Sequence, residues 1–196
     1  MTNIFARFIS SIFGSSGSKL HKSGEQTEAP NLVKSPWPHD LQSLFIEPSR
    51  KDVVEALDGW KWIGLDGLEP VAVSAFGDIF FRATDGSVKW LDMIGGRLTQ
   101  VADTWSQLTT QLNDPDRRDD LLLAGLATAA RKKGMVLSAG ECYDFEKPPA
   151  LGGEMFVERI NTTFFVVKVH IAGQIHRQLK DLPPGTKINK VTISDR

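Results

Sequence analysis

One cysteine and four histidines are the residues whose side chains could perform nucleophilic or metal chemistry in this chain. A nucleophilic thiol at Cys142 needs a histidine base nearby in space, which His170 or His176 could supply. These two histidines are six residues apart, whereas metal ligands on one helix need a spacing of three or four. His21 lies in a linker and His39 lies beside prolines. We therefore interpret Cys142 as a small buried residue and expect no catalytic residue, no cofactor and no metal.

The glycine pairs and the paired carboxylates do not indicate a catalytic site either. Gly95-Gly96 and Gly152-Gly153 match neither a P-loop nor a dinucleotide fingerprint, and they are better explained as turns. Asp119 and Asp120 are neighbours that cannot face each other on a helix. Because no serine lies in a nucleophile elbow either, we predict that the chain is not an enzyme. An enzyme built around Cys142 remains the alternative.

Four carboxylates, Glu141, Asp144, Glu146 and Glu154, lie within fourteen positions, with Lys147 as the opposing charge. They are either ordinary solvated loop residues or a negative surface that faces a basic partner. We name these four as the candidate partner-binding residues.

An antiparallel sheet of three or four short strands is predicted between Pro70 and Val101. Alternating or aromatic apolar runs are separated by Asp85-Gly86 and Gly95-Gly96, which are typical hairpin turns. The expected strands are 70–73, 76–82, 88–91 and the segment around Leu98 and Val101.

Helices are expected on both sides of these strands in the chain. Ahead of them, Leu41, Leu44 and Phe45 have helical spacing that Pro48 ends, and a short helix follows from Ser49, its N-cap, to Leu57. Val53, Val54 and Leu57 are expected to form its buried face. After the strands, the sequence predicts a helix capped by Asp103 that carries Trp105, Leu108 and Leu112, and another from Asp114-Pro115 to about Lys133, ended by Gly134.

The C-terminal third is expected to mix strands, one loop and a helix. The expected elements are a short strand at 135–137, an ordered loop at 138–154, a buried strand at 164–169, a helix with Ile171, Ile175 and Leu179 on one face, and an exposed strand at 186–193. The predicted fold class is thus α+β, with a mostly antiparallel central sheet flanked by helices.

Residues 1–36 form a separate N-terminal part in this interpretation. Apolar residues between positions 4 and 13 recur as one stripe of an amphipathic helix, interrupted by Arg7, and not as a secretory signal. This stripe either docks on the body or contacts a membrane surface or a partner. Residues 14–36 are rich in Gly, Ser and charge and read as a flexible linker to a domain at 37–196.

The net charge of −1 is unevenly distributed along the 196 residues. Residues 37–168 carry fourteen Lys/Arg against twenty Asp/Glu, whereas both ends of the chain are basic. An acidic body disfavours direct nucleic-acid binding and favours a basic protein partner. A single cysteine permits no internal disulfide and fits the cytoplasm.

The run at 140–154, GECYDFEKPPALGGE, resembles the signature of the C-terminal domain of Tdi-type immunity proteins, which protect bacteria from DNase effectors of the type VI secretion system. Residues 173–178, GQIHRQ, continue the resemblance. Residues 76–81, FGDIFF, followed by Asp85-Gly86, resemble the wider group of SMI/KNR-like (SUKH) immunity proteins, which implies a single domain of that kind. The resemblance also implies a Tdi-type part at about 100–190 and a partial GAD-like region at 37–100.

This resemblance implies a protein that binds a cognate nuclease toxin, basic at its active face, and silences it in the cytoplasm in competition between bacteria. An acidic inhibitor suits such a toxin because a DNase must approach phosphates. A regulatory or scaffold module of SMI/KNR-like type is the alternative function. Membrane recruitment through residues 4–13 is a further alternative.

Overall fold

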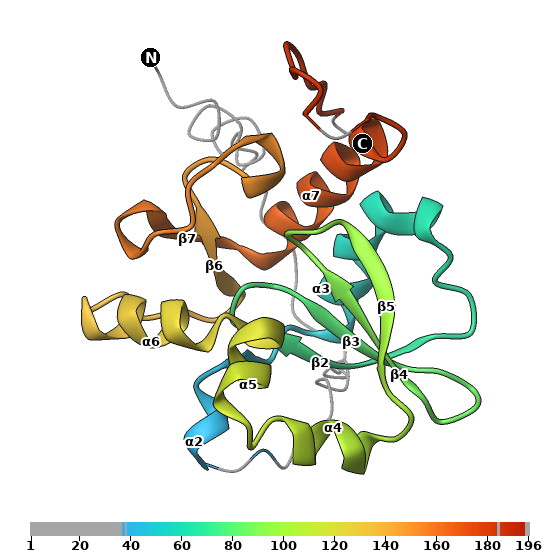
Figure 1. Cartoon of the computed structure of the whole chain (residues 1–196), viewed down its shortest axis with the longest axis vertical. Helices are drawn as coiled ribbons and strands as arrows, with labels where there is room; N and C mark the ends of the chain where they lie inside the picture. The colour runs from blue at the N-terminus through green and yellow to red at the C-terminus, as the bar shows by residue number, and fades with distance from the viewer. Residues whose placement is uncertain (1–36, 38, 184, 195–196) are drawn as a thin grey trace, which may run out of the picture.

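The computed structural model describes residues 37, 39–183 and 185–194, and it has an α+β architecture (Figure 1). An antiparallel sheet lies between two layers of helices, and a two-stranded hairpin packs beside it. The predicted fold class is confirmed. The expectations for residues 1–36 lie outside the described residues, and none of the described helices is long and apolar enough to cross a membrane.

The central sheet is a meander in the order β1-β2-β3-β4-β5. Its strands are β1 (Phe45–Ile46), β2 (Glu69–Ser74), β3 (Ile79–Arg82), β4 (Val88–Asp92) and β5 (Arg97–Ala102). Successive residues of a strand point to opposite faces, so Phe80 packs into one core cluster while Ile79 and Phe81 pack into the other. The predicted strands are confirmed except that Phe76 lies in the turn before β3, and β1 adds a strand where a helix was predicted to continue.

One helical layer contains α2 (His39–Gln42), α4 (Trp105–Gln111), α5 (Pro115–Leu122) and α6 (Ala124–Lys132). The cap of α4 is Thr104, not Asp103 as predicted, because the Thr104 hydroxyl accepts the Gln107 N–H. Asp114 caps α5 as predicted, by accepting the N–H groups of Asp116 and Arg117. Gly134, at a positive φ, follows the end of α6.

The single helix predicted from 115 to 133 is wrong, because Leu123 adopts a left-handed conformation with φ 48° and separates α5 from α6. Two bonds to Asp119 stabilise this break. The Leu123 N–H donates to the Asp119 carbonyl, and the Gly125 N–H donates to the Asp119 carboxylate. Asp119 therefore satisfies a donor in the first turn of the next helix.

The opposite layer contains α3 (Arg50–Ala56), the 3-10 segment η1 (Leu57–Ile63) and α7 (Phe165–Leu179). Ser49 caps the start of α3, as the sequence predicts, and Asp52 completes a capping box with it. Val53 and Ala56 form its buried face, but Val54 is 62% exposed, contrary to the prediction. Helix α7 packs against both α3 and η1.

The hairpin consists of β6 (Glu141–Phe145) and β7 (Ile160–Phe164), joined by the 3-10 turns η2 (Pro149–Leu151) and η3 (Val157–Arg159). Two predictions are therefore wrong: 138–154 contains a strand, and of the strand predicted at 164–169 only Phe164 lies in a strand, β7, while 165–169 belong to α7. The β-branched and aromatic residues there favour a strand locally. Burial overrides this preference, because Phe165, Val169 and His176 are all buried and follow one another at helical intervals of four and seven residues.

Two further predicted strands are absent from the described residues. Residues 135–137 have no regular structure, and residues 186–193 lack a strand ladder. The latter segment instead bonds to glutamine side chains of α7. Ile171 and Ile175 do face the core, as predicted, while Leu179 is half-buried.

Candidate functional site: the hairpin at residues 140–159

The β6–β7 hairpin is fixed against the central sheet at its middle. The Tyr143 N–H donates to the Ala75 carbonyl at 2.8 Å, and the Tyr143 hydroxyl donates to the Met135 carbonyl. Cys142, Tyr143 and Phe145 are buried. The strand that carries Glu141 and Asp144 is thus part of the core and not a solvated loop.

The connection from 146 to 159 owes its shape to the proline and glycine pairs. The N–H groups of Leu151 and Gly153 both donate to the Pro148 carbonyl. A side chain at Gly153 would place its Cβ 1.8 Å from the Lys147 carbonyl oxygen, and Gly152 has φ 82°. The proline and glycine pairs of the signature run therefore fix the backbone conformation of this connection.

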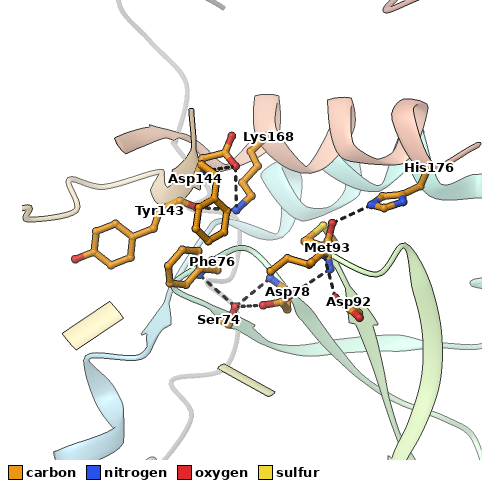
Figure 2. A network of polar contacts seen from close by, with 11 residues as sticks. Ser74, Phe76, Asp78, Asp92, Met93, Tyr143, Asp144, Lys168 and His176 are labelled. Carbon is orange, nitrogen blue, oxygen red and sulfur yellow. Dashed lines mark hydrogen bonds and ion pairs between the residues drawn. The ribbon is translucent and has the colours of Figure 1, made fainter. Parts of the chain in front are cut away.

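Asp144 lies on the inner side of the hairpin, next to Lys168 of α7 (Figure 2). Its carboxylate is 3.4 Å from the Lys168 ammonium, and both side chains are largely buried, at 14% and 8% exposure. The same ammonium donates to the Tyr143 carbonyl at 2.7 Å and lies 5.4 Å from the centre of the Phe76 ring. Asp144 therefore joins the hairpin to α7.

Glu146 and Glu154 lie at the outer end of the hairpin, where both pair with Arg159. The guanidinium is 3.2 Å from the Glu146 carboxylate and 3.4 Å from that of Glu154. All three side chains are more than half exposed. Exposed ion pairs contribute only about 0–1 kcal/mol, so breaking these two pairs costs little stability.

Glu141 lies at the other end of the hairpin, opposite Phe164 in the register. Its carboxylate accepts the Ser138 N–H at 2.8 Å and is half-exposed. The structure thus brings Glu146 and Glu154 together and holds Glu141 and Asp144 apart from them.

Two exposed apolar residues, Met155 and Phe156, adjoin this pair of carboxylates. Phe156 is 60% exposed and Met155 is 37% exposed. The Phe156 carbonyl accepts the Arg159 N–H, so the aromatic residue and the guanidinium belong to one turn. Sequence reasoning missed these two residues, because an apolar pair beside a short turn has no periodicity that separates surface from core.

A buried polar network lies beneath the hairpin and joins the sheet to α7 (Figure 2). The Asp78 carboxylate accepts the Ser74 hydroxyl and the Met93 N–H. Burial raises the pKa of Asp78 to about 6 despite these bonds. His176 of α7 lies 3.0 Å from the Met93 carbonyl, and burial lowers its pKa. Asp78 and His176 both contact the backbone of Met93, so this network has a structural role in joining the sheet to α7.

The environment of Cys142 opposes nucleophilic chemistry. Its side chain is fully buried, and burial raises the pKa of the thiol to about 12. Since the thiolate is the reactive form, this cysteine packs as a small apolar residue. Among the described residues, no group of three His, Cys, Asp or Glu side chains is arranged to hold a metal ion.

Comparison with known families finds a match in the second half of the chain. Residues 102–176 match the family model described as T6SS immunity protein Tdi1, C-terminal. The resemblance inferred from residues 140–154 is confirmed, because that run lies inside the matched segment. The similarity of residues 76–86 to SUKH proteins lies outside it.

Comparison with solved structures finds partial similarity to one crystal structure among others. The crystal structure of Atu4351 from Agrobacterium tumefaciens has 19% sequence identity and a TM-score of 0.45, with 68% of each chain covered. No curated protein matches the chain.

Proposed function

We propose that this chain is an immunity protein that binds a cognate DNase toxin of the type VI secretion system and neutralises it in the cytoplasm of the producing cell. The observation that carries the proposal is the match of residues 102–176 to the Tdi1 immunity family. The acidic central part of the chain supports the choice of a nuclease, since DNA-cleaving proteins bind phosphates with basic surfaces. We further propose that the Tdi-type part spans about 100–190 and that 37–100 is a partial GAD-like region.

We place the toxin contact at the outer end of the hairpin, around Phe156. Aromatic residues, Met and Arg are enriched at the cores of protein interfaces, and Phe156, Met155 and Arg159 lie within five positions there. Glu146 and Glu154 would form a charged rim around this apolar centre. Both remain exposed beside Arg159, which is compatible with exchange of that arginine for a basic group of the toxin.

Glu141 and Asp144 have different roles in this proposal. Asp144 supports the surface from beneath by holding the hairpin on α7 through Lys168. Glu141 extends the negative surface toward the other end of the hairpin, where it is half-exposed.

Coexpression of the chain with the product of its adjacent gene tests the function. We expect that product to be toxic alone, to degrade DNA in the cell, and to lose both effects beside the full-length chain. Copurification of the two proteins at a fixed ratio would identify binding as the cause. A toxic nuclease that keeps its full effect beside a well-expressed chain would overturn the proposal.

Replacement of Phe156 by alanine tests the proposed contact. Loss of a central aromatic anchor weakens a typical interface by about 1–2 kcal/mol, or roughly tenfold or more in Kd. Titration calorimetry with the toxin measures this effect. Val54→Ala is the matched control, because Val54 is 62% exposed on α3, away from the hairpin. Equal affinities for the two variants would remove Phe156 from the interface.

A further inference from the structure

Two glutamines of α7 bind the backbone of an extended segment near the C-terminus. The Gln178 amide oxygen accepts the Thr192 N–H at 3.1 Å, and its nitrogen donates to the Thr192 carbonyl at 2.8 Å. Gln174 makes the same pair with Ser194, at 2.8 and 3.1 Å. Each side-chain amide thus pairs with one residue as a neighbouring β-strand would.

The spacing of helix and strand makes the two pairs compatible. Residues four apart on a helix are separated by about 6 Å along its axis. Residues two apart on a strand are separated by about 6.6 Å, and their N–H and C=O groups point to the same side. Gln174 and Gln178 therefore match alternate residues of an extended chain that runs antiparallel to α7.

Both amides are also held in position by the helix itself. The second N–H of Gln178 donates to the Gln174 carbonyl at 2.9 Å. The Gln174 amide nitrogen lies 2.8 Å from the His170 ring nitrogen Nε2. With His170 Nε2 as the acceptor, both N–H groups of each amide nitrogen are used, so the pair is preorganised to bind a backbone.

The contact involves the backbone and not the outward side chains. Thr192 and Ser194 are exposed, while Val191 and Ile193 are half-buried. A hollow of about 510 Å³ adjoins the segment and is lined by Gln174, Arg177, Gln178, Thr192 and Ser194, among others. There is space beside the two glutamines that residues 192–194 leave unfilled.

We propose that Gln174 and Gln178 form a binding site for an extended polypeptide backbone, with the chain's own residues 191–194 as its resident ligand. This segment is the one ligand that the proposal assigns to the site, and it offers its N–H and C=O groups at alternate residues. Its chemical class is that of β-augmentation, with side-chain amides in place of a sheet edge. This site is separate from the proposed toxin surface on the hairpin and does not depend on it.

Amide hydrogen exchange of the full-length chain tests the resident contact. We expect Thr192 and Ser194 to exchange at least about tenfold more slowly than Val191 and Ile193. Gln178→Ala should abolish the protection at Thr192. Gln178→Glu should lower it less, because the carboxylate keeps the acceptor and loses the donor. Lys180→Ala, at the C-terminal end of the same helix and outside the lining of the hollow, is the control that should leave it unchanged.

A peptide supplied in trans tests the binding site itself. Full-length chain carrying Thr192→Pro and Ser194→Pro lacks both donors and cannot hold its own segment. We expect a synthetic peptide of residues 188–194 to shift the side-chain amide resonances of Gln174 and Gln178 in a saturable way. A peptide with alanine at both outward positions should bind equally well, and one with proline at both should not bind. The proposal would be overturned if the amides of residues 191–194 exchanged at the same rate, or if the peptide of residues 188–194 gave no saturable shift. It would also be overturned if the proline peptide bound as well as that peptide.

Discussion

The crossing of η1 and α7 depends on single glycines. A Cβ at Gly173 would lie 2.5 Å from the backbone of Gly59, and a Cβ at Gly59 would lie 2.3 Å from the His170 carbonyl oxygen. This close approach lets the Trp60 indole N–H donate to the Val169 carbonyl and the Trp62 indole N–H donate to the Gly173 carbonyl. Gly173, part of the run that resembles the immunity family, is therefore a packing residue.

Gly173→Ala should destabilise the protein for this reason. Overpacking of a close contact costs about 1–3 kcal/mol, which urea unfolding of the purified chain measures as a lower midpoint at an unchanged slope. The comparison is Arg177→Ala, one turn away and exposed. If the two variants were equally stable, the backbone contact would not constrain this position.

Asp78 should make stability depend on pH. Its folded-state pKa is raised from 3.8 to about 6, so the folded protein binds a proton more readily than the unfolded chain. The resulting stabilisation is fully present below pH 3.8 and is lost as the pH rises through 6. A two-unit shift corresponds to roughly 2–3 kcal/mol. Asp78→Asn should remove this loss, as measured by unfolding at pH 4, 5, 6 and 7.

His176 acts in the opposite direction and must be separated from Asp78. Its pKa is lowered by burial, so its contribution is present above 6.5 and is lost as the pH falls through the folded-state value. Comparing Asp78→Asn with the unmodified chain at each pH cancels the histidine, because both proteins keep it. A pH-independent difference between them would contradict the assignment to Asp78.

At the scale of elements, the hairpin is joined to α7 by one buried charge pair. Lys168→Met would leave the Asp144 carboxylate without its cation and the Tyr143 carbonyl without its donor. Removal of one partner of a largely buried pair costs roughly 3 kcal/mol. Adding Asp144→Asn should recover part of this loss, because no uncompensated charge remains. Denaturant unfolding of the two single variants and the double variant measures the coupling, and strictly additive effects would exclude it.

The elements that sequence could predict were those with local signals. Ser49, Asp114 and the Asp85-Gly86 turn each act through neighbours within a few residues, and all three are as expected. The start of α7 could not be predicted, because Phe165 to Val169 prefer a strand locally and become helical through contacts with α3 and η1. The helix break at Leu123 could not be predicted either, since a leucine at positive φ has no sequence signal.

The same distinction applies to the candidate site. A charge count along the sequence locates four carboxylates, but it cannot tell that Asp144 faces Lys168 while Glu146 and Glu154 share Arg159. Which cation each carboxylate faces depends on the strand register and on a lysine 24 positions away from Asp144 in the chain. The exposed Phe156 depends on tertiary structure as well, because only the folded chain determines which apolar residues remain outside.

At the scale of the whole molecule, charge should govern how fast the proposed complex forms. Residues 37–168 carry an excess of six acidic groups, and complementary charge raises association rates, most strongly at low salt. Glu146→Lys with Glu154→Lys reverses the charge at the hairpin end. We expect toxin association to slow by about tenfold or more at low ionic strength and by less at high salt.

A charge reversal elsewhere separates local steering from net charge. Glu69 forms an equally exposed pair with Arg82 on the central sheet, at 3.0 Å and with 62% of the Glu69 side chain accessible. Glu69→Lys combined with Asp66→Lys changes the net charge by the same amount, away from the hairpin. Stopped-flow association with the toxin at several salt concentrations should therefore slow much more for the hairpin variant than for this control. If toxin association slowed equally for the two variants, the effect would be due to net charge. If it slowed for neither variant, Glu146 and Glu154 would have no role in recognition.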